Sequence, residues 1–221
     1  ARGGSKRIPN KNIKKFFGKP IINYTIDIIK KSKLFKKIVV SSDNPKILKI
    51  AKKNNCLTHL RSPDYANDHI DTISVIAKIV KDLEKSYNIN SVCCVYPTSI
   101  FITKKNLKEA YNKLKKKNNY VFSAAKFSHP IQRAFLKKSK KIKMFDQKFF
   151  LKRTQDLNEF YYDAAQFYIG WRNSWLKKKI IFQGPNEFIE LNENSFQDID
   201  NPEDWKSALL KWKFLNKDKN F

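Results

Sequence analysis

The alternation of short apolar runs with amphipathic segments along the first 125 residues constrains the fold of this chain most. Each apolar run ends in polar residues, and the segments between the runs carry apolar residues at helical spacing. The predicted strands are residues 36–43, 57–60, 91–96 and 120–125, and the predicted helices are residues 21–31, 46–54, 72–87 and 103–117. Strands joined by helices form parallel sheets through right-handed crossovers. We therefore predict an α/β, Rossmann-like fold with a mainly parallel sheet and flanking helices.

The second half of the chain departs from this alternation. Residues 129–178 combine a basic, hairpin-like segment with a block rich in aromatic side chains, and residues 179–183 and 188–191 follow as predicted strands. The chain contains no internal repeat and no low-complexity linker. We therefore predict a single domain over residues 1–221 with a small inserted lobe at about 129–178.

Residues 1–12 form a glycine loop that is rich in cations and contains no acid. Gly3 and Gly4 can adopt positive φ, so that successive backbone N–H groups turn toward one side. With the cations Arg2, Lys6, Arg7 and Lys11, these amides predict a polyphosphate site, and a disordered basic tail is the alternative. The spacing is not that of a Walker A motif. Because the chain opens directly on this loop and lacks an initiator Met, we expect an apolar strand to precede it in the natural protein.

Near the other end of the chain, Asp198 and Asp200 lie two residues apart. In an extended segment their side chains point the same way, and Mg²⁺ usually binds one or two carboxylates together with phosphate oxygens. The alternative is that Asp200 or Asn201 only caps the helix that begins at Pro202. We also expect the polar residues that end the predicted strands to gather beside the glycine loop, since ligands of such sheets bind at the carboxyl ends of the strands. These residues are 41–43, Arg61 and 97–99.

The formal net charge of +26 suggests nucleic-acid binding, but the type and distribution of the cations argue against it. Only six of the 46 basic residues are arginines, the residue type that recognises phosphates and bases best, and the lysines are spread over the whole length. Three cysteines form neither a disulfide framework nor a zinc motif, which favours a reducing cytoplasm. No apolar run approaches the length of a membrane span. We interpret His59, His69 and His129 as structural or loop residues without partners.

Several motifs, taken in order, resemble those of the acylneuraminate cytidylyltransferases, the CMP-sialic acid synthetases. Residues 1–9, followed by Lys11 and Asn12, resemble the N-terminal signature of that family. Further matches cover nearly the whole chain and lie at 18–20, 41–43, 61–63 with Asp68, 96–99, 153–156 and 198–200.

Two stretches, residues 127–133 and 162–168, resemble the pseudaminic acid branch of the family. Sialic acid synthetases commonly carry Gln where this chain has Tyr96, and Pro-Leu-Arg where it has residues 100–102. These departures favour a modified, less polar nonulosonic acid, a description that pseudaminic acid fits.

The resemblance implies a modified Rossmann fold and a homodimer formed through the inserted lobe. It also implies Mg²⁺-dependent transfer of CMP from CTP to the anomeric hydroxyl of a nine-carbon sugar acid, with release of pyrophosphate. The implied catalytic residues are Arg2, Lys6 and Lys11. The implied nucleotide-binding residues are Arg2, Gly3, Gly4, Ser5, Lys6, Asn12, Arg61 and Asp68. The implied sugar-binding residues are Gln132, Arg153, Gln155, Asp163, Gln166 and Tyr168, and the implied metal ligands are Asp198 and Asp200.

Three alternatives to this function remain open on the sequence. In the first, the sugar acid is another nonulosonic acid, such as N-acetylneuraminate or legionaminate. In the second, the chain is a basic nucleic-acid-binding domain that binds through its net charge. In the third, the chain is a structural or oligomerisation module, and the aromatic block at 149–175 is only an interface.

Overall fold

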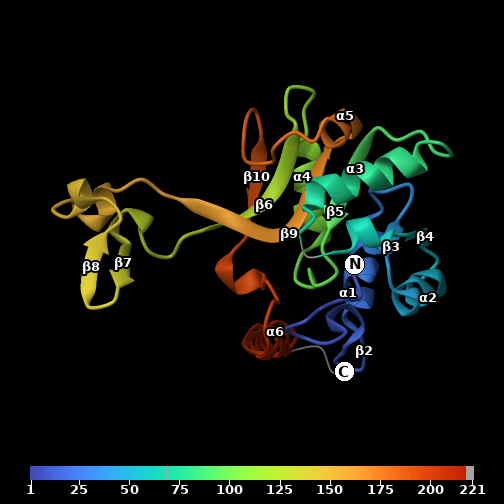
Figure 1. Cartoon of the computed structure of the whole chain (residues 1–221), viewed down its shortest axis with the longest axis horizontal. Coiled ribbons are helices and arrows are strands. Elements are labelled where there is room, and N and C mark those ends of the chain that lie inside the picture. The colour runs from blue at the N-terminus through green and yellow to red at the C-terminus, as the bar shows by residue number, and fades with distance from the viewer. Residues whose placement is uncertain (68, 218–221) are drawn as a thin grey trace.

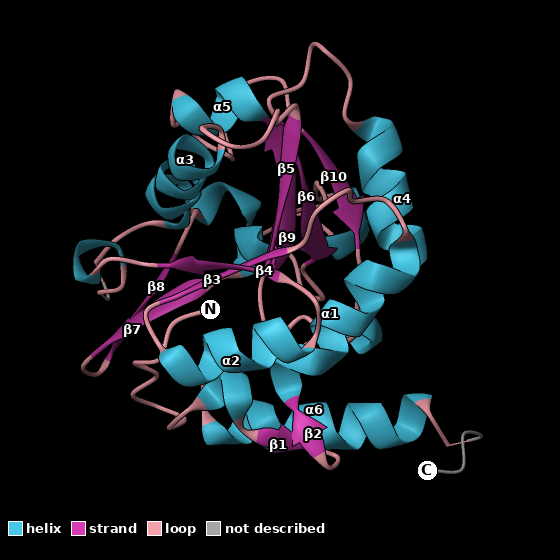
Figure 2. Cartoon of the chain, turned by 90° about the vertical axis from the view of Figure 1, so that its right-hand side faces the viewer, coloured by secondary structure: helices cyan, strands magenta, loops and turns pink. Residues whose placement is uncertain are grey.

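A four-stranded sheet forms the centre of the molecule in the computed structural model, which describes residues 1–67 and 69–217 (Figure 1). Its strand order is β10–β6–β9–β5. The strands are β5 (Ser91–Val95), β6 (Tyr120–Lys126), β9 (Tyr161–Trp171) and β10 (Glu187–Glu190). Figure 2 shows helices on both sides of this sheet. On one side lie α1 (Ile21–Ser32) and α4 (Lys104–Lys113), and on the other α3 (Thr72–Leu83) and α5 (Arg172–Leu176).

A second, two-stranded parallel sheet pairs β3 (Val39–Ser42) with β4 (Leu57–Leu60), and its register places Ser41 opposite His59. The connection is α2 (Pro45–Lys53), whose Asn44 cap accepts a hydrogen bond from the Lys46 amide. An Asn cap followed by Pro at the first helical position is a strong helix start, so the sequence predicted this βαβ unit correctly.

The strands and helices predicted from the alternation are confirmed, but the central sheet is mixed. β10 is parallel to β6, whereas β9 runs antiparallel to both β5 and β6. The chain reaches β9 from β6 without a helical crossover, so β9 returns in the opposite direction, as in a hairpin with a long excursion. Residues 179–183, predicted as a strand, contain no regular element.

That excursion is a lobe that projects from the body of the molecule (Figure 1). It contains the antiparallel hairpin of β7 (Phe135–Lys138) and β8 (Lys141–Met144), in which seven of the eight residues are exposed. Residues 161–171 belong to the central sheet as β9, so the last third of the lobe predicted at 129–178 is part of the body. The aromatic residues of β9 are therefore strand and core residues of the sheet. Composition alone does not distinguish such a strand from an aromatic lobe.

A separate aromatic cluster packs the two ends of the chain together. The ring of Phe16 meets the ring of Trp205 edge-on, with centroids 5.6 Å apart. Trp205 lies on α6 (Pro202–Leu215). Ile8 and Ile199 are buried in the same cluster, at 2% and 0% exposure. Burying each such side chain contributes about 1.5–3 kcal/mol. The glycine loop and the acid pair are therefore brought together by hydrophobic packing of their immediate neighbours.

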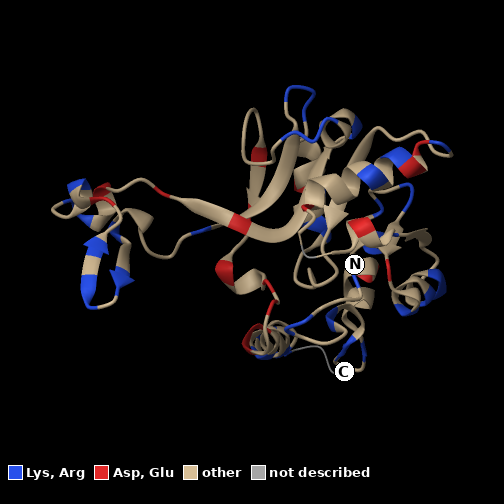
Figure 3. Cartoon of the chain, viewed as in Figure 1, with Lys and Arg blue, Asp and Glu red and all other residues tan. Residues whose placement is uncertain are grey.

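Figure 3 shows basic residues on several separate elements, including the lobe hairpin, α2 and α3. Within the described part of the chain, no helix combines the length and the apolar character that a membrane span requires.

Candidate functional site

The glycine loop is held against the carboxyl end of β3. The nitrogen of Ala1 donates to the carbonyl of Ser41, and the amide of Gly3 donates to Oδ1 of Asp43, both at 2.9 Å. A Cβ on Gly3 would lie only 2.7 Å from the side-chain nitrogen of Asn44, so no larger residue fits there without a shift of that side chain. These contacts to β3 are what a phosphate-binding loop needs and what a basic tail would lack. Asp43 therefore positions the loop.

Asn12 forms a hydrogen bond within the glycine loop. Its side chain is 7% exposed and donates to the carbonyl of Arg2 at 2.9 Å. Asn12 thus orients the backbone at Arg2, which the sequence assigned to the nucleotide. Gly4 and Lys6 are exposed on the same loop, and Ser5 is partly exposed.

Arg61 lies at the end of β4 and reaches back to β3. Its Nη2 donates to the carbonyl of Ser41 at 3.1 Å, and its Nε donates to the hydroxyl of Ser41 at 3.3 Å. Burial lowers the pKa of the Arg61 guanidinium, the charge of Asp43 opposes this, and the nearby charge of Arg2 lowers it further. Arg2, Asp43 and Arg61 are thus close enough to interact electrostatically. Of the polar strand ends predicted beside the glycine loop, Ser41, Asp43 and Arg61 lie there, and the place of residues 97–99 stays a prediction.

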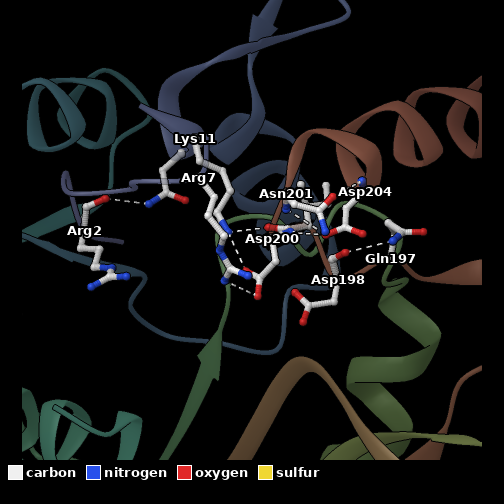
Figure 4. A network of polar contacts seen from close by, with 10 residues as sticks. Arg2, Arg7, Lys11, Gln197, Asp198, Asp200, Asn201 and Asp204 are labelled. Carbon is white, nitrogen blue, oxygen red and sulfur yellow. Dashed lines mark hydrogen bonds and ion pairs between the residues drawn. The ribbon is translucent and has the colours of Figure 1, made fainter. Parts of the chain in front are cut away.

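The acid pair lies on the extended segment that leads into α6. In Figure 4 the carboxylates of Asp198 and Asp200 point to the same side of this segment. Asn201 is the cap of α6, since its side chain accepts from the amide of Asp204, whose carboxylate accepts in return from the amide of Asn201. Asn201 therefore supplies the cap alone, and the carboxylate of Asp200 is available for other partners.

Cations of the glycine loop fill that role. Arg7 donates to Oδ2 of Asp200 at 2.7 Å, and the ammonium of Lys11 lies 3.2 Å from Oδ1 of the same carboxylate. Lys11 also donates to the carbonyl of Ile199. Figure 4 shows both cations approaching Asp200 from the loop. The two halves of the site, 189 residues apart at Lys11 and Asp200, are therefore in direct contact.

The two carboxylates differ in their proton affinity. Partial burial and the neighbouring charge of Asp200 raise the pKa of Asp198, against the opposing charge of Lys11. Partial burial also acts to raise the pKa of Asp200, but the hydrogen bond and charge of Lys11, followed by Arg7, lower it overall. Like charges at this spacing favour binding of a cation between them.

The donor set fits a hard divalent cation that shares its coordination with a substrate. Asp198 and Asp200 offer carboxylate oxygens, the ligands that Mg²⁺ prefers. Among the described residues, no group of three or more His, Cys, Asp or Glu side chains could hold a metal ion. The acid pair would therefore need further oxygens, such as those of phosphates and water.

Of the sugar candidates, Asp163 and Tyr168 lie near the acid pair. Tyr168 donates to Oδ2 of Asp163 at 2.5 Å, and the charge of Asp163 contributes to the raised pKa of Asp198. The ring of Tyr96 meets that of Tyr168 edge-on at 5.8 Å, and its hydroxyl bonds to Thr72 at 2.8 Å. From the sequence, Tyr96 was used to compare branches of the family and was not predicted as a site residue, yet it contacts Tyr168.

The other sugar candidates are not brought to the acid pair within one chain. Gln132 and Gln166 are buried at 4% and 1% exposure, and each donates its Nε2 to a backbone carbonyl, while each Oε1 has no hydrogen-bond partner. Arg153 and Gln155 are exposed on the lobe, where Arg153 pairs with Asp156 at 2.9 Å. Asp68, predicted near the nucleotide, lies outside the described residues.

Comparison with known proteins agrees with this geometry. A family model described as cytidylyltransferase matches residues 1–193. Pseudaminic acid cytidylyltransferase of Campylobacter jejuni is 37% identical over 217 residues, which cover 96% of this chain and 94% of the relative. CMP-N,N'-diacetyllegionaminic acid synthase of Legionella pneumophila is 32% identical and covers 93% and 90%. A solved CMP:2-keto-3-deoxy-manno-octonic acid synthetase in complex with CTP aligns over 97% of this chain and 96% of its own, with a TM-score of 0.72 at 11% identity, a likeness of fold.

Proposed function

Because the chain belongs to the cytidylyltransferase family, we propose that it transfers CMP from CTP to the anomeric hydroxyl of pseudaminic acid, in the cytoplasm, and releases pyrophosphate. The observation that carries the sugar assignment is the 37% identity to a pseudaminic acid cytidylyltransferase along nearly the whole of both chains. The observation that carries the chemistry is the contact between a cationic glycine loop and a pair of carboxylates.

Such a transfer needs positioning and charge compensation more than covalent chemistry from the protein. The anomeric oxygen attacks the α-phosphorus, and the bond from that phosphorus to the bridging oxygen of the β-phosphate breaks. Arg2, Lys6 and Lys11, with the amides around Gly3 and Gly4, would bind the triphosphate and offset the charge that develops on the leaving pyrophosphate. Asn12 and Arg61 would lie beside the nucleoside. Asn12 is anchored by its hydrogen bond to the loop at Arg2, and Arg61 by its hydrogen bond to Ser41 of β3.

Asp198 and Asp200 would hold Mg²⁺. The ion would supply charge neutralisation at the phosphate oxygens. Arg7 and Lys11 now neutralise Asp200, so these two cations would keep the acid pair in place before the ion binds. The same contacts hold the Lys11 ammonium beside the position that the phosphates would occupy.

For the sugar acid, Asp163 and Tyr168 are our candidates, because the charge of Asp163 acts on Asp198 and Tyr168 donates to Asp163. The ring of Tyr96 packs against that of Tyr168. An arginine is the best physical match for the carboxylate of the substrate. Arg153 and Gln155 lie on the projecting lobe, so they would contact the sugar only in the site of a second subunit.

We further propose a homodimer formed through the lobe. A two-stranded hairpin is marginally stable by itself, and the hairpin and the residues that follow it in the lobe expose large apolar side chains that a partner would cover. They are Phe135, Leu136, Ile142, Phe145, Phe150 and Leu151, which are 61–88% exposed.

Replacing Leu136 and Ile142 together with Asp should convert the dimer to a monomer, because two charges would be buried in the interface. Light scattering coupled to size exclusion measures the mass. As a matched control, Leu60 and Leu210, which are equally exposed on the body, should tolerate the same change. A wild-type chain that is monomeric at micromolar concentration would contradict the dimer.

A substrate panel tests the function. Pyrophosphate release should require CTP, Mg²⁺ and pseudaminic acid together, and should be lower with N-acetylneuraminate or a legionaminic acid. Activity with N-acetylneuraminate and none with pseudaminic acid would overturn the sugar assignment while leaving the enzyme class intact. The basic residues are spread over separate elements (Figure 3), and we do not propose nucleic-acid binding.

A further inference from the structure

His59 has partners on both of its ring nitrogens, contrary to the expectation that it lacks them. Its Nδ1 lies 2.9 Å from the hydroxyl of Ser41, the residue opposite it in the β3–β4 register. Its Nε2 lies 3.1 Å from Oδ2 of Asp82 on α3. The imidazole is only 12% exposed. A chain of hydrogen bonds therefore crosses from α3 through both strands of the small sheet.

The direction of these bonds follows from what each group can donate. A guanidinium can only donate, so Nε of Arg61 donates to the hydroxyl oxygen of Ser41. A carboxylate can only accept, so Nε2 of His59 carries the ring proton and donates it to Asp82. With that proton on Nε2, Nδ1 is the acceptor nitrogen, and it accepts the hydroxyl proton of Ser41. The order of donation is Arg61 to Ser41 to His59, and on to Asp82.

Asp82 is a well-defined end for this chain. Lys78, one turn earlier on α3, contacts both carboxylate oxygens of Asp82, at 2.5 and 2.7 Å. Hydrogen bonds from Lys78 and His59 lower the pKa of Asp82, so the carboxylate accepts throughout the neutral range. Ser41 in turn is 7% exposed and holds Arg61 through both its hydroxyl and its carbonyl.

We propose that the chain Asp82–His59–Ser41 is a positioning device for Arg61, and that His59 is its central positioning residue. Without His59 the hydroxyl of Ser41 rotates freely and no longer presents a fixed lone pair to Nε of Arg61. The charge of Arg2 repels the guanidinium, which would then lose one of the two hydrogen bonds that it donates to Ser41. The proposal rests on the proposed function in that Arg61 is taken to contact the nucleotide.

His59→Leu should weaken binding of CTP with Mg²⁺ about 3- to 10-fold, the range of one net hydrogen bond. His59→Asn retains an acceptor near the Nδ1 position and should restore most of this loss. The KM for the sugar acid should stay unchanged in both variants. Titration calorimetry measures CTP binding, and thermal unfolding of each variant checks the fold. Equal weakening by Leu and Asn would overturn the role of the Ser41 bond.

A double-mutant cycle separates positioning from a merely structural role. In an Arg61→Gln background, His59→Leu should change CTP affinity by less than 2-fold, because the group on which it acts is gone. The same loss in both backgrounds would overturn the proposal.

A readout independent of nucleotide makes the test separable from the proposed function. In the wild-type chain, imidazole nitrogen shifts should report the ring proton of His59 on Nε2. Exchange of the Arg61 Nε–H with solvent should accelerate in His59→Leu. The other tautomer, or unchanged exchange, would overturn the proposal even if CTP binds. Correct tautomer and exchange in a chain that binds no CTP would support the hydrogen-bond chain and refute the proposed function instead.

Discussion

Asp198→Asn should reduce turnover about 10³-fold, the order expected when a preorganised charged group is lost from such a site, while leaving the fold intact. Asparagine preserves the shape of the side chain and one acceptor oxygen but removes the charge that would hold Mg²⁺. The expected signature is a fall in kcat in a pyrophosphate-release assay, with an unchanged far-UV spectrum.

The same substitution should leave stability unchanged or raise it. Partial burial and the charge of Asp200 raise the pKa of Asp198 in the folded chain, so the protonated form is the one that folding favours. The ionised form that predominates at neutral pH therefore costs stability, and this cost disappears only as pH falls below the unfolded value. Removing the charge removes the cost.

Glu193→Gln is the matched control, since Glu193 is an exposed acid only five residues away. It should retain wild-type turnover and melting temperature. If Asp198→Asn keeps its turnover, the metal assignment is wrong. If it loses activity only in step with a lower melting temperature, Asp198 is a structural residue.

The sequence identified the chemistry of this site better than its assembly. Glycines followed by cations, and two acids at a spacing of two, are recognisable because residue type and local spacing carry the signal. The family resemblance implied one site for both, but local spacing could not predict the ion pairs between them. Those pairs depend on Ile8 and Ile199 packing in one hydrophobic cluster from opposite ends of the chain. The role of Asp43 was within reach, since it directly follows a buried strand at the edge where ligands bind.

The antiparallel course of β9 and the partners of His59 have a common reason for escaping prediction. Both depend on strand pairing rather than on the residues themselves. An apolar strand such as residues 164–170 fits either direction in a buried sheet, and the direction follows only from how the lobe returns the chain. Ser41 and His59 are 18 residues apart, and only the β3–β4 register makes them neighbours.

Lys11→Met should lower kcat/KM for CTP about 10²- to 10³-fold, because one preorganised cation beside the transferring phosphate is lost. The side chain of Lys11 is only 17% exposed, and methionine keeps most of its unbranched stem. The substitution removes the ammonium that bonds to Asp200 and to the carbonyl of Ile199. Lys15→Met, four residues along and exposed, is the control and should behave as the wild type. Equal effects of the two changes would mean that only net charge matters.

Lys11→Met should also change how the stability of the fold depends on pH, whereas a substitution that affected activity alone would leave this dependence unchanged. The hydrogen bond and charge of Lys11 lower the pKa of Asp200 in the folded chain, so their contribution is present above the unfolded pKa and is lost as pH falls through the lowered value. Without Lys11, Arg7 still pairs with this carboxylate, but the larger of the two lowering effects is gone and the pKa of Asp200 should rise toward its ordinary range. The difference in unfolding free energy between wild type and variant should therefore be largest near neutral pH and shrink below about pH 4, the ordinary range of an aspartate. Urea unfolding at pH 7 and pH 3 measures this difference. A gap that is equal at both pH values would show that Lys11 stabilises the chain through its stem, and that its ammonium does not act on the acid pair.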